Sequence, residues 1–125
     1  AESIEVPSPE VTQLCDAARE NAIHVSIGIS ERSPVSVGCL WNSNLLIGAD
    51  GEVLNHHRKL MPTFYEKLIW AAGDGEGLRV NETPIGKIGM LICGERRRVN
   101  RMSIRWRRRR QRFQWRRKPR SWSWW

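Results

Sequence analysis

The sequence predicts a layered fold of the α+β or α/β class. Three observations predict it: one amphipathic helix near the N-terminus, several short β-rich segments separated by turn-forming residues, and a strong hairpin signal between two of those segments. The 125 residues are enough for at most one domain. Because a sheet must bury its faces and one helix is too small to cover it, we expect the chain to hold only part of a layered fold.

The predicted helix begins at the segment Pro7-Ser8-Pro9-Glu10. Ser8 suits the N-cap, Pro9 suits the first helical position, and Glu10 lies at the positive end of the helix dipole. Apolar residues then recur at helical spacing up to about Asn21, at Val11, Leu14, Cys15 and Ala18. On this face Cys15 is expected to serve as a small buried apolar residue.

The predicted strands are short and cover residues 23–29, 39–47, 52–54, 78–80 and 87–92; the first of them is rich in β-branched residues. Asp50-Gly51 predicts a hairpin turn between the second and third strands, and residues 83–86 join the last two. The long segment 57–77 lies between the hairpins. Long ordered loops in compact domains are often functional, so this segment is expected to carry part of a site.

Charge divides the chain into two parts. Residues 1–95 contain 7 Lys and Arg against 13 Asp and Glu, a net charge of −6, whereas residues 96–125 contain 14 Lys and Arg and no acid. Five of the seven tryptophans also lie in this second part, without helical or strand periodicity. We therefore predict a partial domain over residues 1–95 and an Arg/Trp-rich tail over residues 96–125, which is expected to be disordered.

The tail has two interpretations. A shifted reading frame in a G- and C-rich gene would produce arginine, tryptophan and serine in excess and would begin abruptly. Alternatively, arginine interleaved with tryptophan is a pattern that binds anionic membranes or stacks on single-stranded nucleic acid. The other reading frames of the gene would distinguish the two.

The three cysteines, Cys15, Cys39 and Cys93, are sparse and irregularly spaced. They do not form a disulfide framework, and they fit a reducing, cytoplasmic location. With the three histidines they make no pattern of zinc ligands, so no metal and no cofactor is expected. The sequence has no apolar run of membrane-spanning length.

Cys93 ends an apolar run, and Glu95 follows two residues later. Cysteine is the most nucleophilic side chain near neutral pH when it is ionised. A strand that ends in a sharp turn would expose such a nucleophile, and backbone N–H groups there would stabilise an oxyanion. Taken alone, a cysteine at the end of an apolar run is weak evidence for a nucleophile, and it is more often a buried structural thiol.

The segment from His57 to Glu66 supplies an amine and a carboxylate. Taken alone, Lys59 could be a solvated loop lysine, and Glu66 could pair with Lys67 or Lys59 on a surface. A thiol, an amine and carboxylates together are the set needed for covalent attack on a carbon–nitrogen bond. If Cys93 and Lys59 share one site, the Cys93 sulfur and the Lys59 amine should lie within about 6 Å of each other.

The order of several separated motifs is similar to that of the nitrilase branch of the carbon–nitrogen hydrolase superfamily. The motifs are His57-Arg58-Lys59-Leu60-x-Pro62-Thr63-x-x-Glu66-Lys67-Leu68-x-Trp70, Gly73-Asp74-Gly75, and Thr83-Pro84-Ile85-Gly86-Lys87-Ile88-Gly89-x-Leu91-Ile92-Cys93-x-Glu95. Val6-Pro7-Ser8-Pro9 and Leu40-x-Asn42 also match. The resemblance covers residues 1–95.

The resemblance implies a partial α-β-β-α sandwich of nitrilase type, incomplete at both ends, from a family that forms homo-oligomers. It implies hydrolysis of a small-molecule nitrile by water to a carboxylic acid and ammonia through a cysteine thioimidate. Cys93 matches the nucleophile, Lys59 the catalytic lysine, Glu66 a second glutamate that positions the lysine, and Glu95 the acid two places after the nucleophile.

Two departures from the family pattern matter. No acid of this chain matches the family's general-base glutamate, so we expect the chain alone to be weakly active or inactive. The family has tryptophan after the nucleophile, where this sequence has Gly94. Glycine removes a large side chain there and is expected to loosen the turn.

Overall fold

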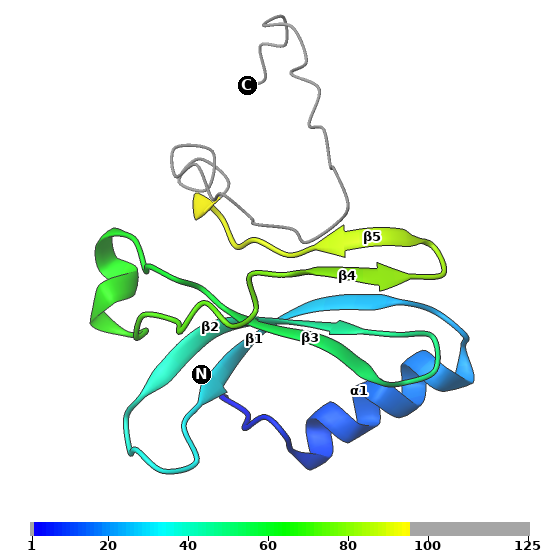
Figure 1. Cartoon of the computed structure of the whole chain (residues 1–125). Coiled ribbons are helices and arrows are strands. Elements are labelled where there is room, and N and C mark those ends of the chain that lie inside the picture. The colour runs from blue at the N-terminus through cyan, green and yellow to red at the C-terminus, as the bar shows by residue number, and fades with distance from the viewer. Residues whose placement is uncertain (1, 96–125) are drawn as a thin grey trace, which may run out of the picture.

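A computed structural model describes residues 2–95 of the chain. The predicted Arg/Trp tail lies outside the described residues, and with it both interpretations of that tail. The described part has one α-helix, one short 3₁₀ helix and five strands, arranged as a mixed α/β structure (Figure 1). This agrees with the predicted fold class.

Helix α1 runs from Pro9 to Glu20, as predicted. The Ser8 hydroxyl accepts a hydrogen bond from the Val11 backbone N–H at 3.4 Å, and Pro9 occupies the first turn. The helix ends at Asn21, whose backbone N–H and side-chain amide both donate to the Ala17 carbonyl. The local signals in the sequence therefore set both ends of this helix.

Three antiparallel strands form the main sheet in the order β1-β2-β3, with β1 at Val25–Arg32, β2 at Leu40–Ile47 and β3 at Val53–Arg58. The predicted hairpin turn joins β2 to β3, with Gly51 in a left-handed conformation at φ 80°. Strand β1 extends three residues beyond the predicted end at Ile29. The extension arises because Glu31 and Arg32 pair with Trp41 and Leu40 of β2.

The two faces of this sheet differ in character. One face carries the apolar core, in which Leu45 and Ile47 of β2 pack with Val11 and Ala18 of α1. Side chains alternate along a strand, so Asn44 of β2 and its cross-strand partner His57 of β3 lie on the opposite face. Figure 1 shows α1 on one side of the sheet and the remaining hairpin on the other.

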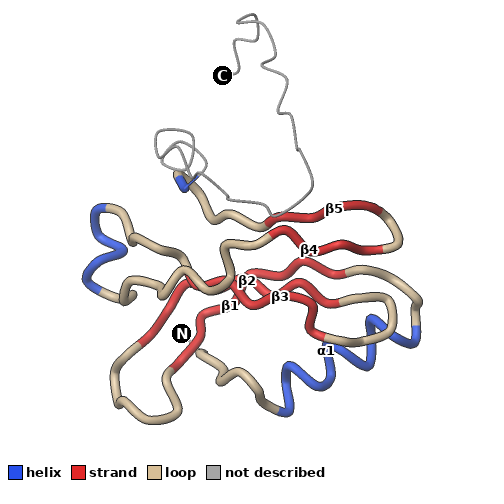
Figure 2. The backbone as a smooth tube through the Cα atoms, in the orientation of Figure 1, coloured by secondary structure: helices blue, strands red, loops and turns tan. Residues whose placement is uncertain are grey.

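That hairpin consists of β4 (Val80–Thr83) and β5 (Gly86–Gly89), which form a separate two-stranded sheet. The last strand was predicted to continue to Ile92, which was wrong. Gly89 pairs with Val80, the first residue of β4, so residues 90–92 have no partner strand within residues 2–95. The chain between β5 and Cys93 is therefore irregular, as the tube in Figure 2 shows.

The long segment between β3 and β4 contains the 3₁₀ helix η1 (Phe64–Leu68) and returns along β3. Its backbone approaches β3 closely at two glycines. A Cβ atom at Gly73 would lie 2.3 Å from the Arg58 carbonyl oxygen, and one at Gly77 would lie 2.4 Å from the His57 Cα. Only glycine fits at either position, and this close approach holds the loop against the strand that carries His57 and Arg58.

Candidate active site

Lys59 lies just beyond the end of β3 and is almost wholly buried, with 1% of its surface exposed. Its backbone N–H donates to the Asn42 carbonyl at 2.8 Å, and its own carbonyl accepts from the Gly73 N–H at 2.8 Å. These two bonds fix the backbone between β2 and the long loop. The Lys59 ammonium donates to Oε2 of Glu66 at 2.5 Å. A buried ammonium needs such a partner to remain charged.

Glu66 is positioned by its own helix start. Its Oε2 also accepts hydrogen bonds from the Thr63 backbone N–H at 2.7 Å and from the Thr63 hydroxyl at 2.9 Å. The hydrogen bond from Lys59, followed by those from the backbone and side chain of Thr63, lowers the pKa of the Glu66 carboxyl to about 2. Glu66 is therefore ionised at neutral pH and is a weak base, suited to holding the lysine rather than to removing a thiol proton.

Cys93 is exposed and lies in a turn rather than in a strand. Its backbone is left-handed, with φ 55°, a conformation uncommon outside glycine, asparagine and aspartate. The turn is closed by the Glu95 N–H, which donates to the Ile92 carbonyl at 3.3 Å. A strained residue in an exposed turn is a frequent feature of functional sites.

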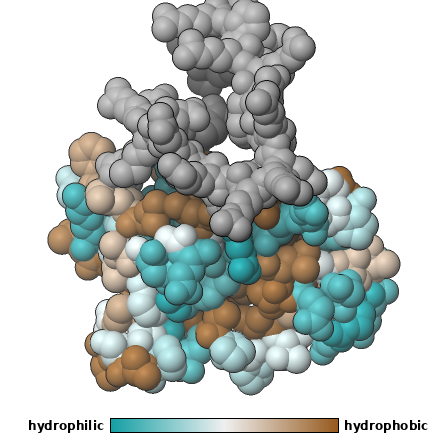
Figure 3. Space-filling view, in the orientation of Figure 1, coloured by the Kyte–Doolittle hydropathy of each residue, from teal (hydrophilic) through white to brown (hydrophobic). Residues whose placement is uncertain are grey.

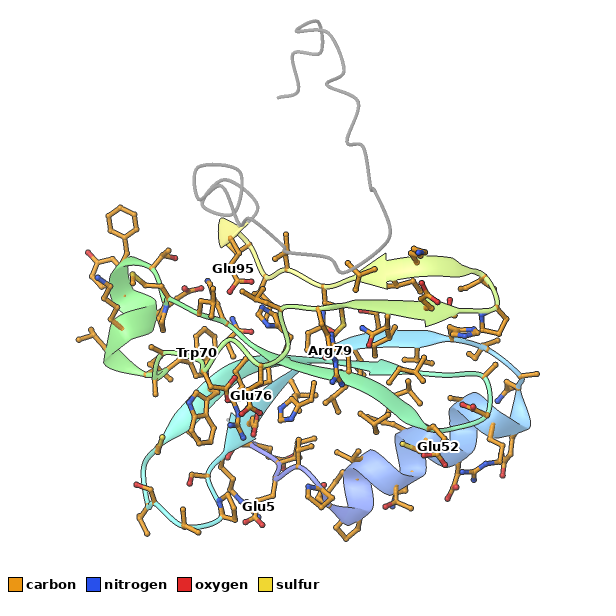
Figure 4. The ribbon with its side chains drawn as sticks, viewed as in Figure 1. Glu5, Glu52, Trp70, Glu76, Arg79 and Glu95 are labelled. Carbon is orange, nitrogen blue, oxygen red and sulfur yellow. The ribbon has the colours of Figure 1, made fainter. Side chains whose placement is uncertain are left out.

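Glu95 connects this turn to the lysine segment. Its side chain is buried, with 4% of the residue exposed, and lies on the side of the sheet away from α1 (Figure 4). Oε1 accepts from the Leu60 backbone N–H at 2.6 Å, and Oε2 accepts from the Ile92 backbone N–H at 2.6 Å. Oε2 also lies 2.8 Å from Nε2 of His57, which is fully buried. One carboxylate thus contacts the neighbours of both Lys59 and Cys93 in the sequence.

On the core face of the sheet, Glu31 forms a second buried polar group. Its carboxylate contacts His56 Nε2 at 2.7 Å and Arg58 Nε at 3.0 Å, and accepts from the Ser43 hydroxyl. Burial of Glu31 raises its pKa, but the hydrogen bonds from His56, Arg58 and Ser43 outweigh burial and lower the pKa to about 2.

Arg58 extends this group to the long loop. Its guanidinium lies 4.1 Å from the centre of the Trp41 ring, and its Nη1 lies 3.0 Å from an oxygen of Asp74. Arg58 and Lys59 are adjacent in sequence, so the anchoring of Arg58 on the core face holds the end of β3 from which Lys59 extends.

The structure brings two of the three predicted site residues into direct contact, Lys59 and Glu66, and it resolves the alternatives for both. Glu66 pairs with Lys59 and not with Lys67, and Lys59 is buried rather than solvated. Cys93 is exposed, so it is not the buried structural thiol that the sequence left open. Whether these three residues catalyse a reaction remains a prediction.

The roles of two residues, Thr63 and Glu95, were not predicted from the sequence. Thr63 holds Glu66, and the pattern Thr63-x-x-Glu66 is a recognisable capping signal that could have indicated it. Glu95 was noted only as part of a motif, and its contact with His57 spans 38 positions in the sequence. No local pattern predicts a contact at that separation.

The environment of the site has further features. Phe64, Tyr65 and Leu68 of the η1 segment are exposed. Figure 3 shows brown, hydrophobic surface at the edge of the molecule where η1 lies in Figure 1. Phe64 is also left-handed, with φ 46°. Within residues 2–95, no three His, Cys, Asp or Glu side chains are grouped to hold a metal ion. In the same range no helix has the length and apolar character required to cross a bilayer.

Comparison with known proteins shows the family to which this chain belongs. The family model described as "Carbon-nitrogen hydrolase" matches residues 1–116, which includes part of the predicted tail. The chain belongs to the carbon–nitrogen hydrolase family.

Within that family, the similar proteins include nitrilases. The chain is 43% identical to Nitrilase 1 of Arabidopsis thaliana over 97 residues, which cover 78% of this chain and 27% of that protein. It is 43% identical to Nitrilase 3 of an unknown prokaryotic organism over 94 residues, which cover 75% of this chain and 28% of that protein. The chain therefore spans less than a third of the length of these relatives.

Two solved structures share the fold. The NitFhit protein of C. elegans superposes with a TM-score of 0.64 at 25% identity, covering 74% of this chain and 24% of that one. A carbon–nitrogen hydrolase from Helicobacter pylori G27 gives a TM-score of 0.59 at 25% identity, covering 69% of this chain and 29% of that one.

Proposed function

We propose that this chain carries the nucleophile and the charge-stabilising lysine of a nitrilase, which converts a small-molecule nitrile and water to a carboxylic acid and ammonia. The observation that carries the proposal is the buried Lys59–Glu66 ion pair, linked through Glu95 to the exposed turn of Cys93. The names of the similar proteins support the nitrile as substrate class.

The proposed reaction begins at Cys93. Its sulfur adds to the nitrile carbon, and the thiol proton ends on the nitrile nitrogen, which gives a thioimidate. The ammonium of Lys59 stabilises the negative charge that develops on this nitrogen. Water then adds to the thioimidate carbon, ammonia leaves, and a second water releases the acid from the remaining thioester.

Glu66 is assigned the task of holding the Lys59 ammonium in place. The low pKa of Glu66 makes it a poor proton acceptor, so the role of general base is not given to it. Among the described carboxylates, Glu95 is also engaged, since it accepts from two backbone N–H groups. The proposal therefore concerns the bond-forming step at Cys93 and not sustained turnover.

Two further properties are proposed with the function. The first is a cytoplasmic location, which the three free cysteines of the described part support because free thiols suit a reducing compartment. The second is assembly into a homo-oligomer in the intact protein. Size-exclusion chromatography with light scattering tests the second.

The test of the proposed function is the addition of an activated aromatic nitrile, such as 2-cyanopyrimidine, to the native chain. We expect the tryptic peptide 88–96, which contains Cys93, to gain the mass of one whole nitrile molecule. Cys15 and Cys39 lie on separate tryptic peptides. Burial raises the pKa of the Cys15 thiol, which makes it less reactive.

Two controls decide the outcome. The variant Cys93→Ser should gain no mass on this peptide. The urea-unfolded chain provides the reactivity of an unassisted thiol. If Cys93 of the folded chain gains the nitrile no faster than Cys93 of the unfolded chain, the fold gives no assistance and the proposed function is wrong.

A further inference from the structure

Glu95 occupies an unusual place between the two segments of the proposed site. Its two oxygens accept hydrogen bonds from Leu60, which follows Lys59, and from Ile92, which precedes Cys93. Both bonds are short, at 2.6 Å, and hydrogen bonds to an ionised acceptor are shorter than those between neutral groups. The two segments are joined through a single carboxylate although more than thirty positions separate them in sequence.

His57 supplies the third contact. The ring is fully buried, and its Nε2 lies 2.8 Å from Oε2 of Glu95. The second ring nitrogen, Nδ1, has no hydrogen-bond partner among the described residues. The Glu95 carboxylate is therefore the polar group of the described structure that orients this ring, and the ring in turn fixes Oε2 from the β3 side.

The Cys93 turn has little other support. Strand β5 ends at Gly89, and residues 90–92 belong to no strand. The left-handed conformation of Cys93 carries a conformational cost of about 1–2 kcal/mol that the surroundings must offset. A Cβ at Gly94 would meet no described atom within 4 Å, so packing at position 94 does not hold the turn. Met90, three positions before Cys93, is buried. The hydrogen bonds that hold the turn in the described part of the chain are those of Glu95.

We infer that Glu95, held in place by His57, is a positioning residue that fixes where the Cys93 turn lies relative to Lys59. The inference rests on the proposed function for its chemical consequence, though not for its geometry. Among the described hydrogen bonds and ion pairs, none joins the Glu95 side chain to the Cys93 sulfur or to the Lys59 ammonium. It acts through the backbone on either side, so its loss should leave the thiol present but misplaced relative to the charge that assists nitrile addition.

The geometric test is amide hydrogen exchange of the full chain followed by NMR. In the wild type, the Leu60 and Ile92 amides should be protected relative to Val37 in the exposed loop between β1 and β2. In Glu95→Gln both amides should exchange about tenfold faster or more, because the charged acceptor is lost. His57→Phe should accelerate exchange at the same two amides to a smaller degree.

The matched control is Glu52→Gln. Glu52 is exposed and lies beside α1, on the other side of the molecule from Glu95 (Figure 4). This variant should leave both amides unchanged. The Leu45 and Leu46 amides of the central strand report folding in every variant. Unprotected Leu60 and Ile92 amides in the wild type would overturn the inference, even if Glu95→Gln fails to fold.

The chemical test compares two reactions of the same thiol. Addition of 2-cyanopyrimidine needs the assisting charge, whereas alkylation by iodoacetamide places no charge on a nitrogen. Glu95→Asp keeps the charge but shortens the side chain, so it cannot hold all three contacts. In Glu95→Asp and in Glu95→Gln, we expect the rate of nitrile addition to Cys93 to fall. The factor of this decrease should be at least about tenfold larger than the factor by which the rate of iodoacetamide alkylation falls.

An equal change in the two reactions would mean that Glu95 affects only exposure or folding, and would contradict the positioning role. If the wild type adds no nitrile, the proposed function fails, and the exchange rates of Leu60 and Ile92 alone then decide whether Glu95 joins the two segments. The two failures are therefore distinguishable.

Discussion

Replacing Lys59 by methionine should slow addition of an activated nitrile to Cys93 by about 10²–10³-fold. Methionine has similar length and suits a buried position, since only 1% of Lys59 is exposed. The substitution removes the one cation that the Glu66 carboxylate contacts at the proposed site. Negative charge on the nitrile nitrogen would then develop without a stabilising partner.

The measurement is the rate of mass gain on peptide 88–96, compared with the rate of iodoacetamide alkylation of the same residue. Alkylation should change far less, because it develops no charge on a nitrogen. Lys87→Met is the control, since Lys87 is a surface lysine paired with Glu82 on the β4–β5 hairpin. If Lys59→Met and Lys87→Met add the nitrile at the wild-type rate, Lys59 has no part in the reaction.

Replacing Glu31 by alanine should lower the free energy of unfolding by about 3 kcal/mol at neutral pH. The carboxylate is 1% exposed and is contacted by His56, Arg58 and Ser43. Its removal leaves buried Ser43 and partly buried His56 and Arg58 without this acceptor, although Arg58 keeps Asp74. Urea denaturation followed by circular dichroism measures the change.

The exposed variant Glu52→Gln is the control and should change stability by no more than about 0.5 kcal/mol. If Glu31→Ala also lowered the free energy of unfolding by no more than about 0.5 kcal/mol, the contacts of Glu31 would not stabilise the fold, and the prediction would be wrong. Because Arg58 anchors the end of β3, Glu31→Ala should also weaken the protection of the adjacent Lys59 amide, which donates to Asn42.

The same carboxylates predict the pH dependence of stability. Glu31 and Glu66 have pKa values of about 2 in the folded chain, against an ordinary value of 4.5. A lowered folded-state pKa contributes stability that is fully present above the ordinary value and is lost as the pH falls from about 4.5 towards 2. Glu31→Gln should flatten the denaturation profile over this interval, and Glu66 should account for part of the slope that remains.

How far the sequence predicted the structure can be judged from particular elements. Helix α1 was predicted correctly because its signals are local: Ser8 and Pro9 set its start, and the spacing from Val11 to Ala18 sets its buried face. The turn at Gly51 was predicted for the same reason. Strand β5 was predicted too long, because an apolar run does not reveal where its partner strand begins.

In the site, too, local contacts could be predicted from the sequence and long-range contacts could not. The Lys59–Glu66 pair spans seven positions, and its residues could be predicted from their motif. The contacts of Glu95 with Leu60 and His57 span 35 and 38 positions, and they depend on how the long loop returns along β3 at Gly73 and Gly77. Such contacts follow from the packed fold and are not encoded by any short pattern.

The central claim is that Cys93 attacks the carbon of a nitrile with help from this fold. The most direct measurement is the ¹³C NMR spectrum of the native chain with an activated nitrile labelled at the nitrile carbon. The account predicts that the labelled signal moves from the nitrile region to that of a thioimidate in the wild type, and that it stays in place with Cys93→Ser. A labelled carbon that remains a nitrile with the wild type, while iodoacetamide still alkylates Cys93, would contradict the account.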